Sequence, residues 1–168
     1  MDPGNLNEVL DICVKSVLLG RWNSNYKAVV DKVEYCEILL NRQTPLLSSL
    51  KSDFNERLSQ EFSFEATTLQ DIRTLFHEAE QLTTNAITLI EAMKPSQGLF
   101  QNLLVHIKCS SEGDWETALR ESSDCIKLFE KMASSICEIA SGFEKAVNEI
   151  QERLRASTVA CNATDSNK

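Results

Sequence analysis

The sequence predicts an all-α protein, and more specifically an antiparallel four-helix bundle with a short connecting helix and an extended last helix. Only 5 Gly and 3 Pro occur among 168 residues, too few turn residues for an all-β domain of this size. Hydrophobic residues make up 42% of the chain, enough for one core. Apolar residues also recur in steps of three and four over long stretches, which is the pattern of one buried helix face.

The first two predicted helices cover residues 6–19 and 25–58. The first ends at Gly20, because glycine is common just after a helix and there predicts a C-terminal cap. Within the second, Thr44-Pro45 resembles a cap followed by proline at the first helical position, so we expect a kink or a brief break there. A loop at residues 20–24 separates the two helices.

The third predicted helix covers residues 68–94, and a short connecting helix follows at 99–108. Thr68 and Asp71 form a variant of the capping box at the start of the third helix. The helix ends before Pro95, since proline disfavours the α conformation of the residue that precedes it. Loops are therefore expected at 59–67, 94–98 and 109–114.

The last predicted helix, residues 115–154, carries the longest apolar stripe of the chain. Its positions follow each other in steps of three and four and suit packing against two neighbouring helices. Gly142 weakens the helix locally and is expected to mark a bend. The domain is predicted to span residues 1–156, with a polar segment at 157–168 as a disordered tail or a linker. The stripe comprises Trp115, Ala118, Ser122, Cys125, Phe129, Met132, Ile136, Ile139, Phe143, Ala146, Ile150 and Leu154.

The charge and the cysteines indicate the class of partner and the compartment. A net charge of −8 repels nucleic-acid phosphates, so no nucleic-acid partner is expected. The six cysteines form no CxxC pair, and four fall on apolar positions of helical patterns, which predicts buried thiols in a reducing compartment. The N-terminus does not resemble a signal peptide. These features favour a cytoplasmic protein.

The sequence contains few groups that carry out chemistry. His77 and His106 are the only histidines, and they lie on different predicted helices. His106 and Cys109 would supply two zinc ligands, which do not complete a tetrahedral site. Motifs for a nucleophilic serine, a phosphate-binding loop, a dinucleotide site and a zinc protease do not occur. We therefore expect no enzymatic activity, no cofactor and no bound metal.

The first predicted helix is amphipathic and has two interpretations. It is either the first core helix of the bundle or a helix that leaves the bundle to enter a membrane or an assembly. In an assembly of several copies, Glu8 and Asp11 would form acidic rings that favour cations. The apolar face consists of Leu6, Val9, Leu10, Cys13, Val14 and Val17.

A basic stretch follows this helix, within residues 15–32. Basic and aromatic side chains near a loop between helices suit contact with anionic lipid headgroups. The alternative is that Trp22 covers the end of the bundle and the lysines are ordinary surface residues. The candidate headgroup contacts are Lys15, Arg21, Trp22, Lys27 and Lys32.

This order of elements resembles the HeLo-like, or four-helix cell-death, domain family. That family includes the N-terminal bundles of mixed-lineage-kinase-domain-like pseudokinases and of plant helper immune receptors. The likeness rests on the amphipathic first helix, the segment Thr44-Pro45-Leu46-Leu47-Ser48-Ser49-Leu50, the segment Leu75-Phe76-His77-Glu78-Ala79-Glu80-Gln81-Leu82, and the short helix before Trp115. It spans residues 5–140 and is a likeness of pattern and order. Members often carry a basic surface, whereas this chain is acidic.

The resemblance implies an N-terminal executor domain of a cell-death or innate-immunity protein. Such domains oligomerise when the attached domain is activated and permeabilise the plasma membrane, in some cases as cation pores. The expected partners are therefore further copies of this chain, membrane lipids and a downstream domain of the same polypeptide. The segment Asn5–Leu19 would be the effector, and activation would move the protein from the cytoplasm to the plasma membrane. The alternative is a helical adaptor that self-associates or binds a partner through residues 141–154, without a membrane step.

Overall fold

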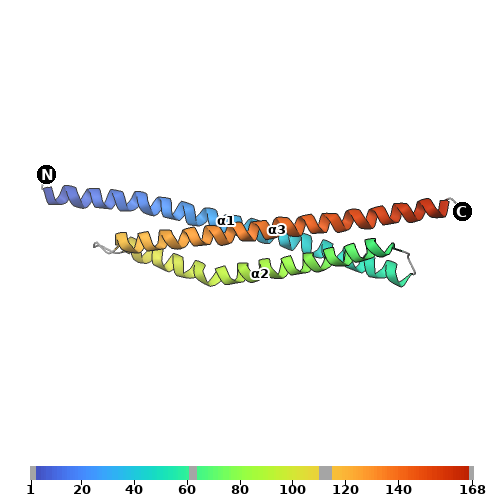
Figure 1. Ribbon diagram of the computed structural model, residues 1–168. Coiled ribbons are helices and arrows are strands. Elements are labelled where there is room, and N and C mark those ends of the chain that lie inside the picture. The colour runs from blue at the N-terminus through green and yellow to red at the C-terminus, as the bar shows by residue number, and fades with distance from the viewer. Residues whose placement is uncertain (1–2, 61–63, 110–114, 167–168) are drawn as a thin grey trace. The chain divides into compact units, whose positions relative to one another are not determined.

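In the computed structural model, the described residues form three long α-helices (Figure 1). They are α1 (Pro3–Ser59), α2 (Ala66–Cys109) and α3 (Trp115–Ser166). The structure describes residues 3–60, 64–109 and 115–166, and no strand occurs among them. The all-α prediction is confirmed. Residues 60, 64 and 65 of the loop predicted at 59–67 lie between α1 and α2, whereas residues 61–63 and 110–114 of the two predicted loops lie outside the described residues. The predicted count of four principal helices is not met.

The chain divides into two compact units, each built from part of all three helices. Unit 1 comprises Met1–Glu34 and Leu89–Ser135, and unit 2 comprises Tyr35–Thr88 and Ile136–Lys168. The boundaries fall inside continuous helices. The sequence near these boundaries therefore lacks the clusters of glycine, proline or polar residues that usually mark the border of a domain.

The predicted loop at residues 20–24 is wrong, because α1 is helical throughout that segment. Leu19 and Trp22 are both buried, so the packed face continues across Gly20. A glycine costs a helix interior about 1 kcal/mol, less than the burial of one large apolar side chain contributes. Pro45, where a kink or break was expected, also lies inside α1.

The predicted loop at residues 94–98 is wrong for a similar reason. Pro95 lies inside α2, which joins the expected third helix and the connecting helix into one element. Met93 and Phe100, on either side of the proline, are both buried. Their packing maintains the helix even though proline lacks the N–H that a helix interior uses.

Unit 1 is held together by an aromatic cluster that joins the three helices. Trp22 and Tyr26 of α1 stack at a centroid distance of 5.5 Å. Phe100 of α2 lies 5.6 Å from the Tyr26 ring and 5.0 Å from that of Phe129 of α3. The Tyr26 hydroxyl donates a hydrogen bond to the backbone carbonyl of Gln97, and burial raises the Tyr26 pKa above its usual value. Further toward the N-terminus, the Lys15 ammonium lies over the Trp115 ring. These contacts place α1 and α3 parallel within unit 1.

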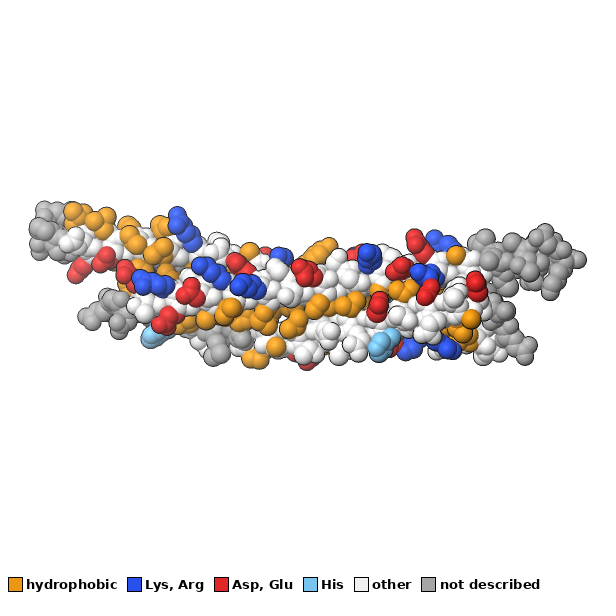
Figure 2. Space-filling model, viewed as in Figure 1, with side chains coloured by type: hydrophobic (Ala, Val, Ile, Leu, Met, Phe, Trp, Pro, Cys, Tyr) orange, Lys and Arg blue, Asp and Glu red, His pale blue; other side chains and the backbone are white. Residues whose placement is uncertain are grey.

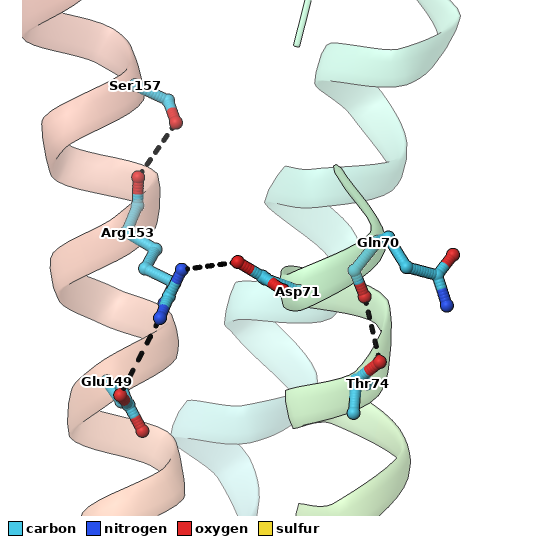
Figure 3. A network of polar contacts seen from close by, with 6 residues as sticks. All are labelled: Gln70, Asp71, Thr74, Glu149, Arg153 and Ser157. Atoms are coloured by element: carbon cyan, nitrogen blue, oxygen red, sulfur yellow. Dashed lines mark hydrogen bonds and ion pairs between the residues drawn. The ribbon is translucent and has the colours of Figure 1, made fainter. Parts of the chain in front are cut away.

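In unit 2, polar and aromatic contacts join the three helices. Arg57 of α1 donates to the backbone carbonyl of Leu154 on α3 at 2.9 Å. Figure 3 shows Arg153 of α3 between Asp71 of α2, at 3.0 Å, and Glu149 of its own helix, at 3.8 Å. The pairs Phe54–Phe76 and Lys51–Glu80 add contacts between α1 and α2. Within unit 2, α2 therefore runs antiparallel to α1 and α3.

Seven of the twelve residues of the predicted stripe of α3 are buried, four are partly buried and one is exposed. Ile136, Phe143, Ile150 and Leu154 are among its buried members. Cys125 is exposed, and the next residue, Ile126, is buried in its place. At this position the buried face is therefore shifted by one residue from the predicted stripe. The helix continues to Ser166, through a segment that the sequence indicated to be a tail or linker.

Replacing Gly142 with alanine is expected to stabilise unit 2 by about 0.5 to 1 kcal/mol. Gly142 lies inside α3, where the bend was expected, and a Cβ atom built on it would lie 3.6 Å from Leu82 Cδ1. That distance is ordinary van der Waals contact, so the methyl group fits and the helix gains its propensity. Thermal unfolding followed by circular dichroism measures the effect. A Gly142→Ala protein that melts below the wild type would show that the glycine is needed for close packing.

Candidate functional site

The strongest candidate site is the N-terminal part of α1, in unit 1, where large apolar side chains are exposed. Figure 2 shows hydrophobic side chains gathered at this end of the helix, with acidic side chains along the opposite edge in this view. We call the surface formed by Leu6, Val9, Leu10, Cys13, Val14 and Val17 the apolar N-terminal face, and all six residues are exposed. Ile12, which was not among the predicted site residues, lies off this face and is 67% exposed.

The apolar N-terminal face lies on the opposite side of α1 from the face that packs in unit 1. The packed face follows steps of three and four through Leu19, Trp22, Tyr26, Val29 and Val33, of which all but the half-buried Tyr26 are buried. Continuing the same steps backward from Leu19 reaches Lys15, Asp11 and Glu8 instead of apolar residues. At about 100° per residue, these charged positions are diametrically opposite Leu6, Leu10 and Val17. The apolar stripe of α1 therefore changes sides near residue 18.

The inward side of this segment is polar and only partly covered. The Lys15 Nζ atom lies 5.7 Å from the centroid of the Trp115 ring, a cation–π contact that joins α1 to the start of α3. Ile12, Lys15 and Leu19 of α1 line, together with Leu104 of α2, an open groove of about 380 Å³. Glu8 and Asp11 are exposed. The core of unit 1 therefore does not require the apolar N-terminal face.

The structure separates the five candidate headgroup contacts. Arg21, Lys27 and Lys32 are exposed, and their helical positions continue the side of α1 that carries the apolar N-terminal face. Lys15 points inward to Trp115. Trp22 is 3% exposed and packs against Tyr26 and Phe100, which corrects its assignment to a headgroup-binding surface. The Trp22 indole nitrogen has no hydrogen-bond partner in the structure.

The cysteines are less uniformly buried than predicted. Cys36 is buried and Cys137 is half-buried, whereas Cys13 and Cys125 are exposed, which corrects the expectation for the last two. Cys36 and Cys137 come together in unit 2, with their Sγ atoms 2.8 Å apart. The sequence carries no signal for this pair, because the residues are 101 positions apart on different helices.

The other candidates provide no comparable constellation. His77 and His106 are exposed. Among the side chains that the structure describes, no three histidine, cysteine or acidic residues gather as metal ligands. Residues 141–154, expected as an adaptor surface, bury their large apolar side chains. In unit 2, Tyr35 and Ile38 of α1 are instead exposed, at 68% and 58%.

Within the described parts of α1, α2 and α3, no stretch is long and apolar enough to cross a membrane. Comparison of the chain with protein families, with curated proteins and with solved structures gives no match.

Proposed function

We propose that this protein is a non-enzymatic executor or signalling module that self-associates and acts on membranes through the first segment of α1. The observation that supports this proposal is the change of side of the apolar stripe near residue 18. Exposed apolar side chains at consecutive helical turns require cover from outside the chain's own core. A family relationship to HeLo-like cell-death domains, with cytoplasmic protein recruited to the plasma membrane, is part of the same proposal.

The side of α1 that carries the apolar face suits a lipid–water interface. An amphipathic helix binds in the plane of a membrane when apolar side chains enter the acyl boundary and basic side chains meet anionic headgroups. Arg21, Lys27 and Lys32 follow the apolar N-terminal face on the same side of α1. The acids Glu8 and Asp11 lie away from that side, so docking would not press them against lipid phosphates.

The apolar segment of a single copy is too short to cross a bilayer, so a pore would require several copies. The twelve residues from Leu6 to Val17 rise about 18 Å as a helix, against roughly 30 Å for the hydrocarbon core of a bilayer. One copy therefore suits the interface. Several copies arranged around an axis would direct their apolar faces to lipid and Glu8 and Asp11 to a lumen. Rings of carboxylates favour cations, so the assembled form is expected to conduct cations better than anions.

Vesicle binding by the purified full chain tests the proposal. Substituting Leu10, Val14 and Val17 with glutamine is expected to weaken binding to phosphatidylcholine–phosphatidylserine vesicles roughly hundredfold, because each loses about 1 kcal/mol of apolar transfer. Dye leakage should be lost in parallel. The matched control substitutes Tyr35, Ile38 and Ile87, which are also exposed, and should bind vesicles normally. If the wild-type protein neither binds vesicles nor releases dye from them at any phosphatidylserine content, the membrane step is excluded.

The second candidate is a helical adaptor that self-associates without a membrane step, and exposed Tyr35 and Ile38 favour it. Light scattering after size-exclusion chromatography separates the two functions. For an adaptor of this kind, Tyr35→Gln with Ile38→Gln should convert an oligomer to a monomer, and substitution of the apolar N-terminal face should not. The executor function, in which the apolar N-terminal face contacts lipid, predicts instead that Tyr35→Gln with Ile38→Gln leaves the oligomeric state unchanged.

A further inference from the structure

The contact between Cys36 and Cys137 joins two helices at a buried position of unit 2. Cys36 of α1 is 2% exposed, and Cys137 of α3 is half-buried. Their Sγ atoms are 2.8 Å apart, whereas a disulfide bond measures about 2.05 Å, so bond formation needs a movement of less than ~1 Å. On the same helices, Leu40, Ile136 and Ala140 are buried as well.

We propose that Cys36 and Cys137 are a redox-modification site, in which a hydroperoxide converts the two thiols into an intramolecular disulfide linking α1 to α3. This inference is independent of the membrane function. A shared zinc ion does not fit the same geometry, because zinc–thiolate bonds of about 2.3 Å at tetrahedral angles hold two sulfur atoms further apart than 2.8 Å.

The reaction balances with one molecule of hydrogen peroxide. The Cys137 thiolate, on the more accessible of the two side chains, attacks one peroxide oxygen and breaks the O–O bond, which yields a sulfenic acid and, after proton transfer, water. The buried Cys36 sulfur then attacks the sulfenic sulfur and releases its hydroxyl group as a second water. Two thiols lose two electrons and two protons, and the peroxide is reduced to two waters. A dithiol reductant reverses the change by exchange.

The position of Cys36 and Cys137 favours a disulfide within one molecule over the non-specific oxidation expected of exposed cysteines. Cys13 and Cys125 are exposed and lie in unit 1, where oxidation leads to sulfenic acids or to links between molecules. Cys36 reaches Cys137 within its own molecule, and little space remains for a bulky thiol to attack it. The sulfenic acid on Cys137 is therefore expected to be short-lived.

The test uses the full chain with only this pair retained, by serine substitution of the other four cysteines. Stoichiometric hydrogen peroxide should give a monomer that has lost two hydrogens in mass, migrates faster on a non-reducing gel, and yields a linked Cys36–Cys137 peptide after digestion. Dithiothreitol should restore the original mass and mobility. The substituted cysteines are Cys13, Cys109, Cys125 and Cys161.

Two further variants keep the outcome decisive. Cys137→Ser in the same background must abolish the fast-migrating form, and Cys36→Ala must instead leave a sulfenic acid on Cys137 that dimedone traps. Circular dichroism before oxidation verifies that each variant is helical. Dimedone labelling of Cys137 in the two-cysteine protein without a cross-link, a disulfide between molecules, or no reaction of the folded protein at all would each overturn the proposal.

Discussion

Phe143→Ala is expected to lower the free energy of unfolding by about 3 to 5 kcal/mol, the range for truncating a fully buried phenylalanine. Phe143 is 0% exposed on α3, and Val147 and Ile150 on the same helix are equally buried. The substitution removes a large apolar surface and leaves a cavity that continuous helices close only in part. Urea unfolding followed by circular dichroism measures the loss as a lower midpoint at an unchanged slope.

The positions of the tryptophans allow the unfolding of unit 1 to be distinguished from that of unit 2 in this experiment. Both tryptophans, Trp22 and Trp115, belong to unit 1, so fluorescence reports that unit alone while circular dichroism reports both. Lys145→Ala is the matched control, since Lys145 lies two residues away on α3 and is exposed, and it should change stability by less than about 0.5 kcal/mol. A loss below about 1 kcal/mol for Phe143→Ala would contradict the packing described for unit 2.

The burial of Phe143 is a part of the fold that the sequence predicts well. Steps of three and four along α3 place Ile136, Phe143, Ile150 and Leu154 on one face, and all four are buried. Periodicity succeeds here because burial of a continuous apolar stripe dominates the energy of a long helix. It is less precise near Cys125, where two adjacent apolar residues compete for the buried position and Ile126 occupies it.

Local helix-breaking signals predicted less well than apolar spacing. Gly20 and Pro95 were both expected to end helices, and both lie inside them. Each penalty amounts to a few kcal/mol at most, and buried residues on both sides outweigh it. Whether a proline ends a helix or is tolerated depends on tertiary contacts, which a single sequence does not display.

The error at Gly20 also hid the main feature of the candidate site. With a loop at 20–24, the first helix has no fixed rotation relative to the second, so its apolar face can be turned toward a core. Once α1 is continuous, the positions of Leu19 and Trp22 fix the rotation of the whole segment, and the apolar N-terminal face lies outside. The six residues were therefore identified from the sequence, but their orientation was not.

The Cys36–Cys137 pair marks the limit of sequence reasoning in this protein. Both residues occupy ordinary apolar positions, and only the relative register of α1 and α3 brings their sulfur atoms together. That register depends on how α1 and α3 each pack along α2. An error of one residue in the register of either helix would rotate one cysteine by about 100° out of contact.

Cross-linking Cys36 to Cys137 is expected to raise the free energy of unfolding by about 3 to 5 kcal/mol. The bond closes a loop across a sequence separation of 101 residues that contains the whole of α2, so it removes much of the conformational freedom of the unfolded chain. The folded state changes little, because the sulfur atoms are already adjacent. The midpoint of urea unfolding for the oxidised two-cysteine protein, compared with its reduced form, measures this gain.

The same comparison distinguishes a constraint on the unfolded chain from a local effect of oxidation. Cys137→Ser treated with the same peroxide has no loop to close, so its midpoint should not move. A gain that arises from the unfolded state should also appear mainly as slower unfolding if α1 and α3 separate in the transition state, and as faster refolding if they are already paired there. An oxidised protein that unfolds at or below the midpoint of the reduced protein would show that closing the remaining gap strains α1 against α3. The bond would then form at the expense of the packing between these two helices.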